Sequence, residues 1–296
     1  MPGNRHELFT SSLEQAQQQF DAAAHIGFES RALNLYYGIS QAGRAISAAL
    51  TPVGSEMAPE VSGHGLRVLN LRSVQASDFW EVEVRGIGGE NSSYGRLAYL
   101  LNSDPLDSPV TLGAIWHMIP ELCLDYPIGH YPELRGTDKP YFQQGEPIDH
   151  NAFIVQATAT EIEKDAQVLR RTYPDLIDAE LVRFGGGSYS THDDGTRTDE
   201  ALFTSSRGIQ LRKLRNDTVL MPACNDGSKA LDPLLTWWVL LYTLSMVTRY
   251  EPVIWTRIID VNRSPIAVLL ETALSKALEA VPVQMHASLI SAPSEH

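Results

Sequence analysis

The sequence predicts a mainly helical α+β protein, with helices from both ends of the chain in one bundle and a strand-containing region in the middle. Three observations support this expectation. Residues 30–50 and 228–250 are two long stretches whose apolar residues recur at helical spacing. Between them, residues 79–85 (FWEVEVR) alternate apolar and charged side chains, which is typical of a strand. Helices at both ends around a mixed middle indicate an α+β fold.

The stretch 30–50 is expected to organise the bundle. Its apolar face consists of Leu35, Ile39, Ala42, Ile46 and Ala49. A second stripe is polar and aromatic and consists of Asn34, Tyr37, Ser40, Gln41 and Arg44. A helix that is apolar on one side and hydrogen-bonding on another is expected to lie inside a bundle. Ser30 is the expected N-cap, and Pro52 with Gly54 is expected to end the helix.

The remaining elements follow from hydrophobic spacing, capping residues and turn signals. Further helices are expected at 6–25, 108–118, 158–171, 228–250 and 264–280, with a short helix around Trp255. Strands are expected at 66–71, 79–85, 152–158 and 181–184, and as a pair at 209–214 and 218–221. Residues 126–150 and 185–198 are expected to be connections. We expect a single domain over residues 1–296; the alternative is an internal split into a helical bundle, 1–125 with 228–296, and a mixed α/β insertion, 150–222.

Composition argues against several classes of protein. The formal net charge of −13 and the pI near 5.1 argue against generic binding to duplex DNA, which needs a positive field. The longest apolar-rich run, residues 234–247, is shorter than the roughly 20 residues that span a bilayer. The polar N-terminus lacks the apolar core of a signal peptide. These features predict a soluble, cytoplasmic protein that does not bind a membrane.

No metal or cofactor site is expected. The chain has two cysteines, Cys123 and Cys224, and no CxxC pair, so cysteine-ligated zinc is unsupported. Two reduced thiols are favoured over a disulfide in the cytosol. The cluster His192, Asp193 and Asp194 lacks metal-ligand spacing and is expected to be a solvated loop. The signatures of serine hydrolases, P-loop NTPases and zinc proteases do not occur.

Arg44 and Arg249 are the charges that stand out, because each lies on a stretch dominated by apolar and aromatic residues. Arginines buried in such helices must be paired. One interpretation is a clamp for an anion or phosphate between two helices, since a guanidinium suits two-pronged phosphate contacts. The other, which structural ion pairs in general favour, is a pairing with Glu251, Glu29 or a carbonyl near a helix end.

His64 lies between two glycines in the segment Ser62-Gly63-His64-Gly65. It is interpreted either as a general base or ligand close to the bundle, or as a ring that ties down a tight turn. The one local basic concentration consists of Arg207, Arg212, Lys213 and Arg215, and a solvated strand edge is favoured there over nucleic-acid contact. Core packing is favoured for Trp237, Trp238 and Trp255.

Four stretches, in this order, resemble the YaaC-like family of bacterial proteins. They are residues 30–46 (SRALNLYYGISQAGRAI), 62–66 (SGHGL), 112–122 (LGAIWHMIPEL) and 241–255 (LYTLSMVTRYEPVIW). The resemblance extends over about residues 10–285. It implies a soluble bacterial protein of a family that has no settled biochemical activity.

The tyrosine-rich stretch 30–46 is also similar to a helix of HEPN domains, which include ribonucleases and RNA-binding modules of toxin and antiviral systems. Their catalytic signature is an arginine with a polar residue after it and a histidine four to six residues later. Arg215-Asn216 has the required start, but no histidine follows it in range, and none follows Arg44. The resemblance therefore implies an HEPN-like bundle without the ribonuclease signature.

Two functional hypotheses follow. The first is a non-catalytic or regulatory HEPN-like binding module of a bacterial stress or antiviral system, which recognises a protein, nucleotide or RNA partner. Its candidate ligand-binding residues are Tyr37, Ser40, Gln41, Arg44 and Arg249. The second is an enzyme, a nuclease or nucleotide-processing enzyme, with a noncontiguous site of His64, Arg44 and Arg249. If these three residues lie together in the fold, a shared site is favoured. If they are more than about 10 Å apart, the hypothesis of a shared site is excluded. Homo-oligomerisation is left open.

Overall fold

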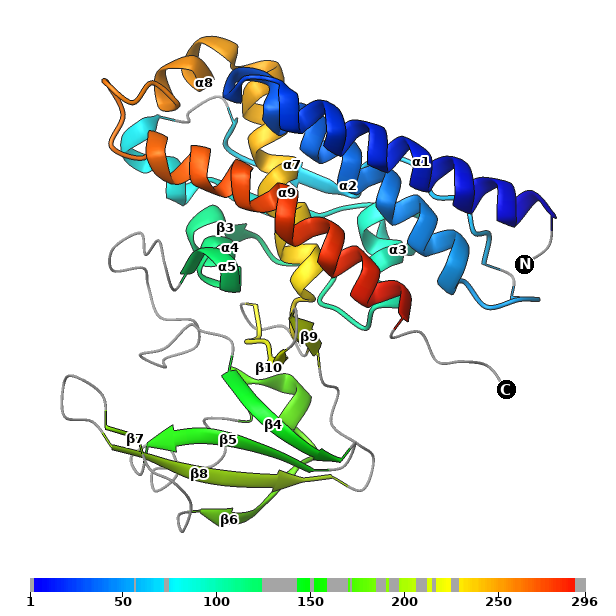
Figure 1. Ribbon diagram of the computed structural model, residues 1–296, viewed down its shortest axis with the longest axis vertical. Coiled ribbons are helices and arrows are strands. Elements are labelled where there is room, and N and C mark those ends of the chain that lie inside the picture. The colour runs from blue at the N-terminus through cyan, green and yellow to red at the C-terminus, as the bar shows by residue number, and fades with distance from the viewer. Residues whose placement is uncertain are drawn as a thin grey trace. The chain divides into compact units, whose positions relative to one another are not determined.

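The structure is a computed structural model that describes residues 3–55, 57–71, 75–123, 143–149, 152–158, 170, 172–184, 190–191, 197–205, 212–214, 217–224 and 229–290. It is mainly helical with small antiparallel sheets, which confirms the predicted α+β class (Figure 1). The chain divides into two compact units, Met1–Tyr131 with Asp232–His296, and Pro132–Leu231. Each unit is described separately.

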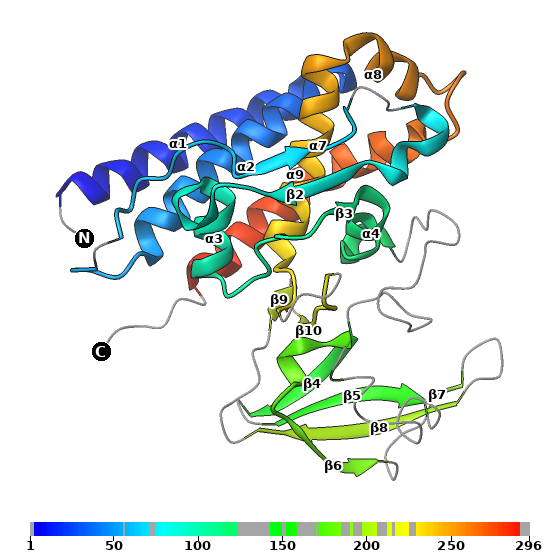
Figure 2. The same ribbon diagram turned by 180° about the vertical axis from the view of Figure 1, so that it is seen from behind.

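The first unit is built on a helical hairpin. Helices α1 (Gly3–His25) and α2 (Phe28–Leu50) lie side by side along their length (Figures 1 and 2). The expected N-cap, Ser30, is wrong, because the helix begins one turn earlier. Gly27 takes the cap position, and its carbonyl accepts the backbone N–H groups of Ser30 and Arg31. The hairpin connection is thereby too short to leave Ser30 outside the helix.

Helix α7 (Pro233–Tyr250) is the centre of the first unit, since residues 233–248 are buried all round. Asp232 caps it by accepting a hydrogen bond from the backbone N–H of Leu234 at 2.9 Å, so it begins five residues after the expected start. Helix α2 packs on α7, and its apolar face of Leu35, Ile39, Ala42 and Ile46 is completely buried. The core therefore forms where the two long apolar stretches meet.

Three tryptophans belong to the core of the first unit, as predicted. Trp237, Trp238 and Trp255 are all almost completely buried. The indole N–H of Trp237 donates to Oε2 of the buried Glu121 at 3.3 Å, and that of Trp255 donates to the carbonyl of Glu29 at 3.0 Å. The second bond ties the start of α2 to helix α8 (Pro252–Ile258).

A small antiparallel sheet, in the order β1-β2-β3, lies against α7 (Figure 2). Its strands are Leu66–Val68, Glu83–Gly86 and Val110–Thr111. The strand expected at 79–85 is wrong in its first half, because Ala76–Glu81 is a 3-10 helix with a capping box between Gln75 and Asp78. That turn buries Phe79 and sets the ring of Trp80 4.9 Å from Trp116. Tertiary aromatic packing thus overrides the alternating pattern.

The helix expected at 108–118 is also shorter than predicted. Pro109 lies outside any helix, Val110 and Thr111 form β3, and Thr111 caps helix α4 (Leu112–His117). A short 3-10 turn (Gly89–Asn91) and helices α3 (Ser93–Leu100) and α5 (Pro120–Cys123) complete this region. Val110 and Thr111, which the sequence predicts to be in the helix 108–118, pair instead with β2.

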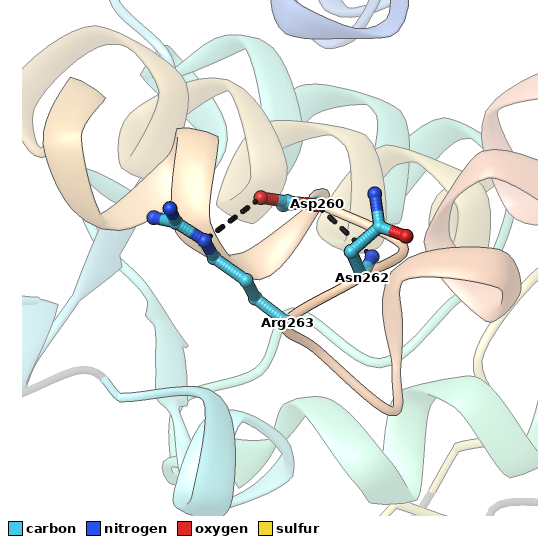
Figure 3. A network of polar contacts seen from close by, with 3 residues as sticks. All are labelled: Asp260, Asn262 and Arg263. Atoms are coloured by element: carbon cyan, nitrogen blue, oxygen red, sulfur yellow. Dashed lines mark hydrogen bonds and ion pairs between the residues drawn. The ribbon is translucent and has the colours of Figure 1, made fainter.

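The turn between α8 and α9 is closed by its own side chains. Asp260 accepts the backbone N–H of Asn262 through Oδ1 at 3.0 Å, and its Oδ2 lies 3.2 Å from Nε of Arg263 (Figure 3). Both side chains of the ion pair reach solvent, so its contribution to stability is small. Helix α9 (Ala267–Ile290) then continues through Pro282, past the expected end at residue 280, and packs against α2 and α7.

The second unit contains an antiparallel sheet with the strand order β6-β8-β5-β4-β10-β9, with β7 paired to β8. The strands are Gln143–Asp149 (β4), Ala152–Thr158 (β5), Glu180–Phe184 (β6), Ser190–Thr191 (β7), Arg197–Thr204 (β8), Arg212–Leu214 (β9) and Asp217–Leu220 (β10). A 3-10 turn, Pro174–Leu176, precedes β6.

Strands β5, β6 and the β9–β10 pair confirm the sequence-based expectations. The connection expected at 126–150 is wrong at its end, because residues 143–149 pair with β5 as strand β4. Strand β8 was not anticipated, although it is the partner of both β5 and β6. The helix expected at 158–171 falls outside the described residues except at its ends. No described helix is long and apolar enough to cross a membrane.

Candidate functional site

The segment that carries His64 is held in place by hydrogen bonds to its backbone, so its imidazole is not needed to fix the turn. Gly63 and Gly65 both have left-handed backbone conformations, with φ of 65° and 79°. The hydroxyl of Ser93 donates to the carbonyl of Gly63 at 2.7 Å. The backbone N–H of Tyr94 donates to the carbonyl of His64 at 3.3 Å. The start of α3 therefore fixes this turn beside α2 and α7.

Two tyrosines from different helices contact the ring of His64, which is exposed. We call Tyr36, His64 and Tyr242 the tyrosine–histidine cluster. The hydroxyl of Tyr36 on α2 is 2.7 Å from Nδ1 of His64, and the two rings are 5.6 Å apart. The ring of Tyr242 on α7 lies 5.9 Å from the imidazole and 5.5 Å from Tyr36. Tyr242 is itself fixed, because its hydroxyl donates to the carbonyl of Leu66 at 2.7 Å.

The cluster keeps its three rings uncharged. Burial lowers the pKa of His64, and the nearby positive charges of Arg249 and Arg44 lower this pKa further. Burial raises the pKa of Tyr36, and proximity to Tyr242 and Tyr37 adds to the rise. Burial likewise raises the pKa of Tyr242 to about 12. At neutral pH the site therefore presents a neutral imidazole between two neutral phenols.

Arg44 and Arg249 are both exposed, which corrects the expectation that they are buried. Arg44 occupies the side of α2 that no neighbouring helix covers, although residues 42, 43 and 45–48 around it are buried. Arg249 lies in the last turn of α7, where the helix emerges from the core. Within the described part of the chain, neither guanidinium has an ion-pair or hydrogen-bond partner. The expected pairing with Glu251 or Glu29 does not occur there.

The two arginines nevertheless belong to one electrostatic environment, because both lower the pKa of the same imidazole. Arg44 on α2 and Arg249 on α7 therefore each lie near enough to the His64 ring for their charges to act on it. Tyr36 occupies Nδ1, and among the described residues Nε2 has no hydrogen-bond partner. The result is an exposed imidazole with two guanidiniums nearby, neither of which uses its N–H donors in a hydrogen bond to a described residue.

The other predicted ligand-binding residues differ in their relation to the cluster. Ser40 interacts with Tyr36 through a hydrogen bond that partly opposes the rise in the Tyr36 pKa. The Tyr37 ring is exposed and lies 6.0 Å from that of Tyr36. Gln41 is half-buried, and no contact with the cluster is described for it. Their roles in binding stay predictions.

Sequence reasoning missed Tyr36 as the partner of His64, and it missed Arg67, whose charge acts on the Tyr242 pKa. A signal for Tyr36 was present, since Tyr36, Ser40 and Arg44 are spaced four residues apart and share one face of α2. No signal in the sequence connected this face with a turn 28 residues further on.

The remaining candidates lie outside the described residues or in the second unit. His192, Asp193 and Asp194 lie outside the described residues, as do Arg207 and Arg215. Arg212 and Lys213 are part of β9 in the second unit. Among the residues that the structure describes, no three His, Cys, Asp or Glu side chains are grouped so as to hold a metal ion.

The fold and the site define a mainly helical α+β protein whose two central helices carry an exposed pair of arginines around a tyrosine-bound histidine. The family model described as YaaC-like Protein matches residues 3–289, and the chain belongs to this family. No curated protein and no solved structure matches the chain.

Proposed function

We propose that this protein is a binding module for a phosphate-bearing ligand, which Arg44 and Arg249 grip on either side of His64. The observation that carries the proposal is that two exposed guanidiniums, neither with a hydrogen-bond or ion-pair partner among the described residues, act on one imidazole. A guanidinium offers a planar fork of N–H donors that matches phosphate oxygens. The HEPN-like resemblance of α2 supports an RNA end or a nucleotide as the ligand, in a bacterial stress or antiviral system.

The charge of the whole chain makes this arrangement selective. With a net charge of −13, the protein repels polyanions in general. A local pair of guanidiniums still attracts a phosphate at short range, because the field of distant carboxylates is screened beyond about 10 Å at ordinary salt. The site therefore suits a small phosphate-bearing ligand or a strand end better than an extended duplex.

Loss of either arginine should weaken phosphate binding without loosening the fold. We expect Arg44→Ala and Arg249→Ala each to raise the Kd for 5′-AMP by roughly tenfold or more, since a charged hydrogen bond contributes about 1.5–3 kcal/mol. Arg44→Lys should bind nearly as weakly as Arg44→Ala, because lysine lacks the fork. Isothermal titration calorimetry measures the binding, and thermal unfolding measures the stability.

The matched control is Arg263→Ala, which removes an exposed arginine paired with Asp260 at the α8–α9 turn. All four variants should melt close to the wild type, since substitutions of exposed side chains usually change stability by less than about 0.5 kcal/mol. Wild-type affinity in Arg44→Ala and Arg249→Ala, or no binding of 5′-AMP by the wild type at millimolar concentration, would refute the proposal.

The pH dependence of His64 offers an independent check on the geometry. We expect its pKa, followed by NMR of the imidazole protons, to lie below the ordinary value, and to rise in Arg249→Ala and less strongly in Arg44→Ala. Sulfate, a dianion whose charge is constant in this range, should raise the His64 pKa and bind more tightly as pH falls. An unchanged His64 pKa in both arginine variants would show that the guanidiniums do not act on the ring.

The lowered pKa of His64 also makes the stability of the folded protein depend on pH. The lowered pKa means that the folded state binds fewer protons to His64 than the unfolded state does. This contribution to stability is complete above the unfolded pKa of about 6.5. It is lost as pH falls through the lower pKa of the folded state.

An enzyme is the second candidate function, and one observation favours it. His64 is neutral at pH 7, and its Nε2 is without a described partner, so it meets two conditions for a general base. Cleavage of single-stranded RNA or hydrolysis of a nucleotide that stops in His64→Gln, with Arg263→Ala unaffected, would establish catalysis. Binding without turnover supports the module.

A further inference from the structure

Two exposed tyrosines border the tyrosine–histidine cluster on opposite helices. Tyr37 on α2 is 41% exposed, and Tyr250 at the end of α7 is 55% exposed. The Tyr37 ring lies 6.0 Å from Tyr36 in the cluster. Tyr250 lies near enough to Tyr242 to contribute to the raised pKa of that residue. Aromatic rings therefore continue from the buried Tyr36 and Tyr242 to an exposed tyrosine on each of the two helices.

Each exposed tyrosine shares a helix with one arginine of the proposed phosphate site. The guanidinium carbon of Arg249 is 5.2 Å from the centre of the Tyr250 ring. Tyr37 and Arg44 are seven residues apart on α2, which places them on the same side of the helix and about 10 Å apart along its axis. A ligand that is held by a phosphate at the arginines would extend over a tyrosine face in either direction.

We propose that Tyr37 and Tyr250 are stacking positions for nucleobases, so that the ligand is a nucleotide or a short single-stranded nucleic acid. This inference rests on the proposed function. Every base has a flat π-face that stacks on an aromatic side chain, whereas bases inside a duplex are already stacked on one another. Exposed tyrosines beside a phosphate clamp therefore fit a base-bearing single strand. A phosphorylated protein segment offers no matching pair of flat rings.

The test compares two ligands that carry the same phosphate, with and without a base. Calorimetry should show that the wild type binds 5′-AMP roughly tenfold more tightly than ribose 5-phosphate, because stacking of one base contributes about one factor of ten. The double variant Tyr37→Leu/Tyr250→Leu should remove this preference while leaving the affinity for ribose 5-phosphate unchanged, because one base can stack on either tyrosine. Tyr37→Trp should retain the preference, since the flat ring is kept.

The chain offers a matched control in Tyr99, which is 52% exposed on α3 and outside the cluster. Tyr99→Leu should bind both ligands like the wild type. Arg249→Ala should weaken both ligands, which separates the phosphate site from the stacking positions.

The outcomes distinguish the two proposals. Equal binding of 5′-AMP and ribose 5-phosphate by the wild type, both weakened in Arg249→Ala, would overturn the stacking positions and leave the phosphate site standing. Tighter binding of a phosphoserine peptide than of 5′-AMP would overturn them as well. Absence of binding of any of these ligands would overturn both proposals.

Discussion

Gly43→Val should destabilise the helical unit by about 3 kcal/mol or more, because it inserts a branched side chain where two helices touch. A Cβ atom at Gly43 would lie 2.4 Å from Cζ3 and 2.5 Å from Cη2 of Trp238, and 2.7 Å from Cδ1 of Leu97. Trp238 is completely buried and cannot swing aside. The helices α2 and α7 must therefore separate. Thermal unfolding should show a drop of about 6–12 °C for a unit of this size.

Gly38→Ala is the matched control, since Gly38 is buried on the same helix. A Cβ there would lie 3.0 Å from the ring of Phe20, which is only half-buried on α1 and can yield. The gain in helix propensity from glycine to alanine, about 1 kcal/mol, should offset the crowding. Gly38→Ala should therefore melt near the wild type. Equal melting temperatures for Gly43→Val and Gly38→Ala would contradict the close approach of α2 and α7.

Gly65→Ala should both destabilise the protein and release His64. The left-handed conformation of Gly65 costs an alanine about 1–2 kcal/mol. In addition, its Cβ would lie 2.6 Å from Oγ of Ser92 and 2.8 Å from the backbone nitrogen of Tyr94, and a backbone atom cannot rotate away. We expect a total loss of about 3 kcal/mol. The displaced turn should then break the contact between Tyr36 and His64.

Gly63→Ala separates the cost of the left-handed backbone from the cost of the steric overlap. Gly63 shares the left-handed conformation, but a Cβ at this position meets nothing within 4 Å. Its variant should lose only the conformational term, about 1 kcal/mol. NMR should show the pKa of His64 rising toward 6.5 in Gly65→Ala, as burial and proximity to the arginines are lost, and staying low in Gly63→Ala. A low His64 pKa in a folded Gly65→Ala protein would show that the turn does not position the ring.

The geometry of the site explains why a binding role suits it. Its interior contains the hydrogen-bonded tyrosines Tyr36 and Tyr242, while its two arginines lie at the surface without hydrogen-bond or ion-pair partners among the described residues. Exposed arginines keep their hydration until a ligand arrives, so the free protein bears no cost of a buried unpaired charge. In the proposed function, a phosphate meets guanidinium donors from Arg44 and Arg249 near one imidazole.

Local spacing was enough to predict much of this protein. The buried face of α2, the core tryptophans of α7 and the pairing of strands near residues 212–220 follow from patterns that a short window contains. The glycines around His64 likewise indicated a sharp turn with an exposed ring. These features depend mainly on the burial of apolar surface, and the spacing of apolar residues along the chain indicates which surface is buried.

Only the folded arrangement shows which residues meet and which face water. Arg44 and Arg249 lie on apolar helices, yet both are exposed, because Arg44 is on an uncovered side of α2 and Arg249 is in the last turn of α7, where the helix leaves the core. Phe79 and Trp80 take a 3-10 turn instead of a strand, because this turn buries Phe79 and packs the Trp80 ring on the distant Trp116. The hydrogen bond between Tyr36 and His64 joins a helix to a turn far along the chain. Such contacts depend on packing between segments, which local spacing does not encode.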